Sequence, residues 1–161
     1  MPTRFLSDPY RRASRRDVVT GVMVLVASSA LSGCGSAIPR PRAIRLKRDV
    51  CQYCGMPVGD PRFAAEIWDS DYGRVRIYDD FGCAVMAAEG RGEIGRSDVA
   101  FWVADETEPT RWLDARSAHY RSGAPTPMAH GYAAGPQIGH GIDFAAATSD
   151  IREKALCAHS T

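Results

Sequence analysis

The strongest alternation of apolar and polar positions lies in "RVRIYD", residues 74–79. Val75 and Ile77 fall on one face there and alternate with charged or aromatic residues, a period of two that indicates a β-strand. "RFAAEIW", residues 62–68, alternates less regularly but is also typical of a strand. Between them "DSDYG", residues 69–73, is rich in turn-forming residues. The two runs therefore predict a β-hairpin.

A helix is predicted directly after the hairpin. Asp80 is suited to be its N-cap, and within "FGCAVMAAEG", residues 81–90, Phe81 and Val85 recur at the spacing of one helix face. "DVAFWVAD", residues 98–105, is strongly apolar and predicts another strand. The first part of the domain thus has the order β-β-α-β.

A weaker version of this order follows. Residues 111–115 predict a strand, residues 116–121 a short helical stretch, and residues 128–135 a short strand or loop. Prolines keep residues 122–127 irregular. Residues 144–156 predict a helix. The whole pattern predicts an α+β fold with a mostly antiparallel sheet and helices on one side.

The N-terminus has the pattern of an export signal. Five arginines in residues 1–16 precede an apolar run of 14 residues at 18–31, which is too short to span a bilayer, where about 20 are needed. The run ends in "LSGC", which resembles the bacterial lipobox, so residues 1–33 are interpreted as a lipoprotein signal peptide and Cys34 as the lipidated residue. "SRRDVV", residues 14–19, resembles a twin-arginine export signal.

These signals predict a lipoprotein that is anchored to a membrane and faces the periplasm. Two acyl chains give stable anchoring without a membrane-spanning segment. Residues 34–48 are interpreted as a lipid-anchored tether with proline and basic residues, residues 49–149 as the folded domain, and residues 150–161 as a disordered tail. The basic residues of the tether favour anionic headgroups, although a simple spacer explains them too.

The net charge of the protein is informative only when the predicted signal peptide is left out of the count. The chain has 20 basic and 19 acidic residues, a formal net charge of +1. Five basic and two acidic residues fall within residues 1–33, so the remainder has 15 basic and 17 acidic residues and a formal charge of −2. A nearly neutral protein lacks the basic surplus typical of nucleic-acid binding, so no nucleic-acid partner is expected.

The segment "CQYCGMPV", which begins at Cys51, places two thiols and a thioether within six residues. Gly55 permits a turn that brings Cys51 towards Cys54. Cys54 and Met56 are two residues apart and point the same way in an extended chain. Thiolates and thioethers are soft ligands that suit Cu(I), so this segment is a candidate copper site.

Three other interpretations of the cysteine pair stay open at this stage. A structural zinc site requires four ligands and usually two such pairs. A thiol–disulfide oxidoreductase using Cys51 and Cys54 is the main alternative function, although prolines at 57 and 61 oppose the long helix that usually follows a redox CxxC. An incidental disulfide is favoured by the oxidising environment of an exported protein.

A second candidate segment is "TPMAHG", residues 126–131. Met128 lies there in a proline-bounded loop rather than on a periodic apolar face, which makes it a candidate ligand. His130 follows two residues later and can point the same way.

The third candidate segment is "YDDFGC", residues 78–83. It places Cys83 in the first turn of the predicted helix, where the positive end of the helix dipole would lower the pKa of its thiol; a buried small residue explains this cysteine equally well. The neighbouring Asp79 and Asp80 are interpreted as an N-cap pair.

Taken in order, these motifs resemble the NosL family of copper-binding lipoproteins. The resemblance rests on the lipobox cysteine, "CQYCGMPV", "RFAAEI", "YDDFGC", "FWVAD" with "RWLDARSAHY", and "TPMAHGYAA", and covers residues 49–135 plus the signal. It implies two related ββαβ units and a membrane-anchored periplasmic chaperone for Cu(I). It also implies a copper-accepting partner, either an enzyme or its membrane assembly complex, and the best known members serve nitrous oxide reductase.

Carried over by position, the resemblance makes Cys54, Met56 and Met128 the first choices as copper ligands, and Cys51 and Cys83 match further family cysteines. After residue 135 the chain departs from the family pattern, and "CAH", residues 157–159, has no counterpart there. No enzymatic activity is expected, because the sequence shows no catalytic triad, paired-carboxylate site or phosphate-binding loop.

Overall fold

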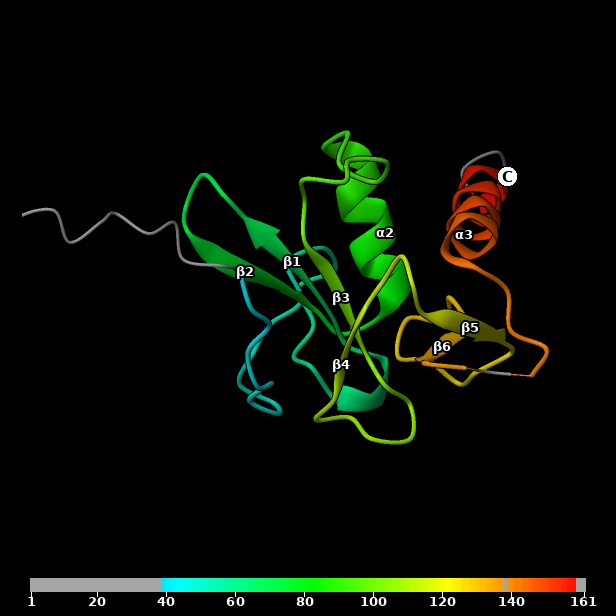
Figure 1. The fold of residues 1–161 in the computed structure, drawn as a ribbon, viewed down its shortest axis with the longest axis horizontal. Helices are drawn as coiled ribbons and strands as arrows, with labels where there is room; N and C mark the ends of the chain where they lie inside the picture. The colour runs from blue at the N-terminus through cyan, green and yellow to red at the C-terminus, as the bar shows by residue number, and fades with distance from the viewer. Residues whose placement is uncertain (1–38, 138, 159–161) are drawn as a thin grey trace, which may run out of the picture. The chain divides into compact units, whose positions relative to one another are not determined.

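The computed structural model describes residues 39–137 and 139–158. The predicted signal peptide, the twin-arginine motif and the lipidated Cys34 lie outside these residues. The elements, drawn in Figure 1, are the 3₁₀-helix η1 (Pro61–Phe63), the strands β1 (Ala65–Asp69) and β2 (Arg74–Tyr78), the helix α2 (Phe81–Gly90), the strands β3 (Phe101–Ala104), β4 (Trp112–Asp114), β5 (His119–Ser122) and β6 (Tyr132–Gly135), and the helix α3 (Phe144–Ala158). The α+β class expected from the sequence is thereby confirmed, with antiparallel strand pairing throughout these elements.

The main sheet has four strands in the order β2-β1-β3-β4. The predicted hairpin forms its first pair, in the register Ala65↔Tyr78 and Asp69↔Arg74. Gly73 closes the connecting turn with a φ of 58°, a left-handed conformation that glycine adopts without steric cost. β1 is central and pairs with β3 on its other edge.

One face of this sheet packs against α2. The alternating residues Ala65, Ile67 and Tyr78 enter the main core together with Phe81 and Val85 of the helix. This is the helix face that the sequence periodicity predicts. Figure 1 shows α2 lying beside β1, β2 and β3, so the first ββαβ unit has the expected order.

The second sheet consists of β5 and β6, and α3 follows it and packs against α2. The helical stretch predicted at 116–121 is wrong: the Asp114 side chain accepts hydrogen bonds from the backbone N–H groups of Arg116 and Ser117, which closes a turn, and β5 begins at His119. Tyr120 of β5 is buried and stacks on Phe81, with 4.4 Å between ring centroids.

The second unit is less complete than the first. β4 pairs with β3 and so extends the main sheet. Within residues 39–137 and 139–158 no strand follows α3, so the second unit has two strands and one helix there in place of ββαβ.

The face of the main sheet opposite α2 is covered in part by residues 39–48. Ile44 packs beside Val58, Ala64 and Ile77. The backbone N–H of Arg42 donates to the buried carboxylate of Glu66, at 2.8 Å. The prediction of a tether from 34 to 48 is therefore wrong for residues 39–48, which belong to the folded unit because they bring apolar and polar partners to the sheet.

The C-terminal boundary of the folded domain also differs from the predicted one. The expected helix is present, but it runs on to Ala158, and Ile151 is buried in the main core. A disordered tail from residue 150 is thus wrong as far as 158. None of the helices in the described part of the chain is both long and apolar enough to cross a membrane.

Candidate metal centre

The CxxC segment folds into a tight turn. The N–H of Cys51 donates to the Met56 carbonyl at 2.8 Å, and the N–H of Gly55 donates to the Cys51 carbonyl at 3.0 Å. Gly55 has a φ of 77°, as the sequence analysis anticipated for this position. The N–H of Gln52 donates to the carbonyl of Ile77, so the turn is fixed against the end of β2.

A third thiol and a carboxylate come from the junction between β2 and α2. Asp80 is the N-cap, and its Oδ1 accepts a hydrogen bond from the N–H of Gly82 at 2.8 Å. The cap places Cys83 in the first helical turn and Asp79 just before the helix. As a result four side chains each offer one ligand atom, all within 4.8 Å of one another: Cys51, Cys54, Asp79 and Cys83.

This thiol cluster (Cys51, Cys54, Asp79 and Cys83) is closed on its inner side. Cys51, Cys83 and Asp79 are buried, whereas Cys54 is partly exposed. The Cys54 thiol donates to Oδ1 of Asp79 at 3.5 Å. A metal ion would therefore enter and leave past Cys54.

The four groups alter one another's protonation. The hydrogen bond from Cys83, together with backbone N–H groups, lowers the pKa of Cys51 to about 4. The same bond and burial raise the pKa of Cys83 well above its usual range. Burial raises the pKa of Cys54 to about 11, and burial with the bond to Cys51 raises that of Asp79 to about 6. Cys51 is thus the thiolate of the cluster.

The lowered pKa that the helix dipole predicts for Cys83 is wrong. The hydrogen bond with Cys51 and burial raise the pKa of Cys83, whereas the same bond lowers the pKa of Cys51. A neighbouring thiolate at hydrogen-bond distance outweighs the partial charge of a helix terminus.

The two candidate methionines are partly exposed, and their backbones are bonded close to the thiol cluster. Met56 is 54% exposed, and its carbonyl accepts the bond from Cys51. Met128 is 39% exposed, and its N–H donates to Oδ2 of Asp80 at 3.0 Å. Both backbones are thus tied to residues of the cluster or its helix cap, and ligation by either thioether stays a prediction.

His130 belongs to the same loop as Met128. It packs so closely on α2 that a Cβ at Gly82 would lie 2.1 Å from His130 Cγ. The loop and the start of α2 therefore fit together through the missing side chain at position 82. Asp80 adds a second link, because it caps α2 with one oxygen and binds Met128 with the other.

Asp79 was missed as a candidate ligand. The motif "YDDFGC" contains it, but two adjacent aspartates before a helix have an ordinary explanation as caps. Only Asp80 caps the helix, which leaves Asp79 for the thiol cluster. Cys157 lies exposed on α3 and outside the cluster, and His159 is outside the described residues.

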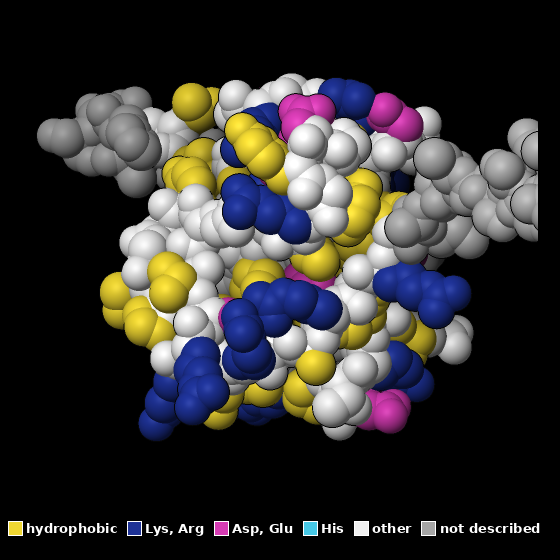
Figure 2. Space-filling model, turned by 90° about the vertical axis from the view of Figure 1, so that its left-hand side faces the viewer, with side chains coloured by type: hydrophobic (Ala, Val, Ile, Leu, Met, Phe, Trp, Pro, Cys, Tyr) yellow, Lys and Arg dark blue, Asp and Glu magenta, His cyan; other side chains and the backbone are white. Residues whose placement is uncertain are grey.

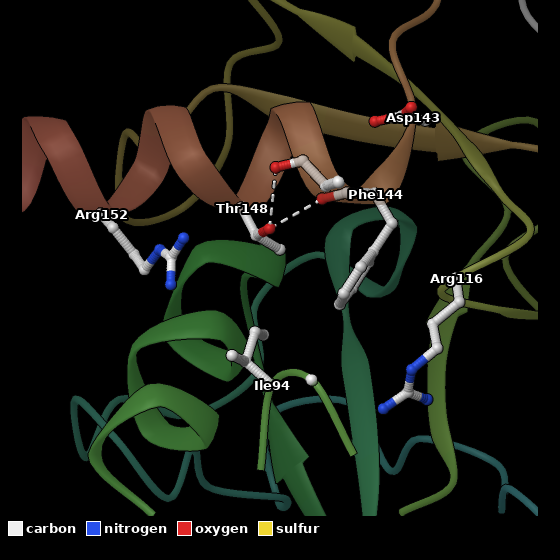
Figure 3. A pocket seen from close by; sticks show the side chains of 8 residues that line it. Ile94, Arg116, Asp143, Phe144, Thr148 and Arg152 are labelled. Atoms are coloured by element: carbon white, nitrogen blue, oxygen red, sulfur yellow. Dashed lines mark hydrogen bonds between the residues drawn. The ribbon is translucent and has the colours of Figure 1, made fainter. Parts of the chain in front are cut away.

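A cavity of about 450 Å³ lies elsewhere, at the start of α3. Figure 3 shows Phe144 and Thr148 lining it, with the Thr148 hydroxyl donating to backbone carbonyls of its own helix. The guanidinium of Arg116 donates to the carbonyls of Val99 and Arg96. The polar groups of Arg116 and Thr148 are therefore engaged in structural contacts. None of the thiols lines this cavity.

Three thiols and a carboxylate at this spacing suit a soft or borderline metal ion. Thiolate and thioether ligands select Cu(I), zinc or iron–sulfur clusters over hard cations. The same thiols are also close enough together to take part in disulfide exchange. The CxxC turn, however, continues into a β-bridge between Val50 and Pro57 and not into a helix.

Fold and site together define a small α+β domain that gathers thiols at a strand-to-helix junction. Among solved structures it is similar to the crystal structure of the copper chaperone NosL from Shewanella denitrificans, with a TM-score of 0.52 and 15% sequence identity over 72% of this chain and 89% of that chain. At this identity the similarity establishes a shared fold. No protein-family model and no curated protein matches the chain.

Proposed function

We propose that this chain is a membrane-anchored copper chaperone of the periplasm. It binds Cu(I) at the thiol cluster and delivers the ion to a copper enzyme, for which nitrous oxide reductase is the first candidate. The observation that carries the proposal is the convergence of Cys51, Cys54 and Cys83 from two separate segments. The solved structure with the same fold is described as a copper chaperone, which supports the choice of metal and of role.

The geometry favours transfer of the ion over permanent storage. The inner thiols are buried, but Cys54 reaches the surface, so an acceptor can attack the ion from one side. Met56 and Met128 are partly exposed, and their thioethers would serve as weak ligands for the departing ion. Stepwise replacement of ligands then moves the ion without releasing it into solution.

Acyl anchoring at Cys34 confines donor and acceptor to one membrane surface. Confinement raises the effective concentration of each partner for the other, which speeds transfer without any new contact. Export through the twin-arginine route suits a domain that folds before it crosses the membrane.

Anaerobic Cu(I) titration against a competing chelator tests the proposal. We expect Cys51→Ser, Cys54→Ser and Cys83→Ser each to weaken Cu(I) binding on the order of 100-fold or more, since loss of a direct ligand exceeds the 10–100-fold effect of residues that merely support one. Cys157→Ser is the matched control, because that cysteine is exposed and outside the cluster.

Met128→Leu, with Met86→Leu as its control, should slow transfer to the copper-free acceptor enzyme.

Unchanged affinity in all three cysteine variants would falsify the proposal. If Cu(I) binding is weak in the wild type, and the Cys51/Cys54 pair exchanges disulfides with a substrate regardless of Met56 and Met128, the oxidoreductase alternative holds. If Cu(I) binds but the acceptor enzyme gains none, the chain sequesters copper and the delivery step is wrong.

A further inference from the structure

The segment that the sequence alone suggests to be a spacer forms a fixed basic surface. Residues 40–48 contain five basic residues, Arg40, Arg42, Arg45, Lys47 and Arg48. The buried carboxylate of Asp49 accepts hydrogen bonds from the backbone N–H of Arg45 and from the guanidinium groups of Arg42 and Arg45. The N–H of Lys47 donates to the carbonyl of Val58. These bonds hold the segment against the domain.

Most of the positive charge of this segment stays available. Asp49 neutralises one charge in the pairs with Arg42 and Arg45, and both guanidinium groups stay solvent-accessible. Lys47 and Arg48 are exposed, and among residues 39–137 and 139–158 neither has an ion-pair partner. Figure 2, which looks onto the side of β2 and the N-terminal segment, shows Lys and Arg side chains gathered there with few Asp or Glu side chains.

Apolar side chains accompany these charges. Leu46 is 47% exposed within the segment, and Val50, two residues after Arg48, is 50% exposed. Figure 2 shows hydrophobic atoms between the basic ones on this face. Exposed aliphatic residues among lysines and arginines are typical of surfaces that rest in the interface of an anionic bilayer.

We propose that this basic face, formed by residues 40–50, docks onto the surface of an anionic bilayer. The proposal rests on the membrane anchoring proposed above. Six residue steps separate Cys34 from Arg40, and a fully extended chain spans at most about 3.5 Å per step, so an acyl anchor keeps Arg40 within roughly 20 Å of the bilayer. A surface that is basic, partly apolar and permanently held near lipid has the bilayer as its nearest complementary partner.

Docking would orient the metal centre. The basic face leads directly into the CxxC turn, whose start is fixed by Asp49 and by the bridge between Val50 and Pro57. The thiol cluster then stays at the level of the membrane, where an integral membrane acceptor can reach it. The acyl anchor alone fixes distance but leaves orientation free.

Vesicle co-sedimentation of the metal-free chain from Gly35 to Thr161 tests the proposal without contributions from the acyl group, the signal or copper. All described helices and strands lie within this chain. We expect binding to phosphatidylcholine vesicles that contain about one-third phosphatidylglycerol, and much weaker binding to pure phosphatidylcholine. Each basic residue near an anionic surface contributes roughly a five-fold factor, so Lys47→Asn with Arg48→Gln should weaken binding about 25-fold.

The matched control is Arg91→Gln with Arg152→Gln, which removes the same charge from the C-cap of α2 and from α3. Lys47 has a φ of 57°, a conformation that asparagine adopts readily, so the variant should keep its fold and its melting temperature. Leu46→Ser should weaken binding further, and high salt should abolish the difference between the two vesicles.

Equal loss in both double variants would overturn the proposal, because net charge and not this face would then bind lipid. Equal binding to both vesicles would overturn it as well. If neither the wild type nor the double variant binds vesicles, but Lys47→Asn with Arg48→Gln slows copper transfer, the basic face recognises a protein acceptor and not lipid. Because copper is absent from the co-sedimentation assay, its outcome does not depend on whether the chain binds or delivers copper.

Discussion

At the scale of single residues, Asp80 and Gly82 connect the two segments that surround the thiol cluster. Asp80 uses one carboxylate oxygen for the helix cap and the other for the loop of Met128. Gly82 provides the space into which His130 packs. The position of the loop relative to the thiols thus depends on a short side chain at 80 and on the absence of one at 82.

We expect Gly82→Ala to destabilise the protein by about 1–3 kcal/mol, the usual cost of overpacking, even though alanine favours a helix by up to about 1 kcal/mol over glycine. The added Cβ would lie within 2.1–2.5 Å of three His130 atoms. Urea unfolding of the metal-free protein measures the change.

The matched background is His130→Gly, because alanine would keep the His130 Cβ that lies 2.4 Å from the added methyl group, whereas glycine removes it. There Gly82→Ala should be neutral or stabilising, so the two substitutions should show a coupling energy. Equal destabilisation in both backgrounds would show that the close approach of His130 is not the cause.

At the scale of elements, the N-terminal segment is held on the sheet by a buried carboxyl group. Glu66 of β1 is fully buried, and only its Oε2 accepts a hydrogen bond, from the N–H of Arg42. Burial raises the pKa of Glu66 to about 7. The folded protein therefore favours the neutral acid, whereas the unfolded chain ionises near pH 4.5.

This difference predicts stability that falls as pH rises. Between about pH 4.5 and 7 the unfolded state gains from ionisation of Glu66 while the folded state still holds the proton, so Glu66 by itself should lower the free energy of unfolding by on the order of 3 kcal/mol over this range. Glu66→Gln, which stays neutral and keeps an acceptor for Arg42, should remove this dependence. Urea unfolding at several pH values measures both proteins.

Other groups contribute as well: the raised pKa of Asp79 acts in the same direction as that of Glu66, and the lowered pKa of Cys51 acts in the opposite direction, but both are common to wild type and Glu66→Gln. Asp49, whose pKa is held well below its usual range by Arg42, contributes stability that is lost only as pH falls below about 4. The comparison of wild type with Glu66→Gln cancels that contribution. An identical pH profile for the two proteins would rule out Glu66 as the source.

At the scale of the whole molecule, one apolar core joins the elements of the described residues. The main core joins α2, the helix-facing side of the sheet, Tyr120 of β5 and Ile151 of α3. Cys51 and Cys83 are themselves packed within it. A domain with a core of this kind is expected to fold without a bound metal ion.

Thermal unfolding of the metal-free protein should therefore be cooperative. Its melting temperature should be the same with and without excess chelator. Added Cu(I) should raise it, because a ligand that binds only the folded state stabilises that state by mass action. Circular dichroism follows the transition. A protein that loses its secondary structure on chelation would instead contain a structural metal site, as zinc sites of small domains do.

Much of the first unit was predictable because its signals are local. The hairpin, the cap at Asp80 and the helix from Phe81 to Gly90 follow from alternation, turn residues and periodicity within a few positions. The stretch at 116–121 was not, because β5 exists only through its pairing with β6, a contact between distant segments. The N-terminal segment was misread for the same reason, since its partners lie on β1 and β2.

For the site, the sequence by itself determined which sulfur groups are present and that Gly55 permits a tight CxxC turn, because both are properties of the local chain. Only the tertiary structure decided that Cys83 and Asp79 join Cys51 and Cys54, that Met56 and Met128 are partly exposed, and that the bond from Cys83 lowers the pKa of Cys51. Proximity between distant segments, and the burial that shifts a pKa, arise from how the strands and helices pack, and no short stretch of sequence carries that information.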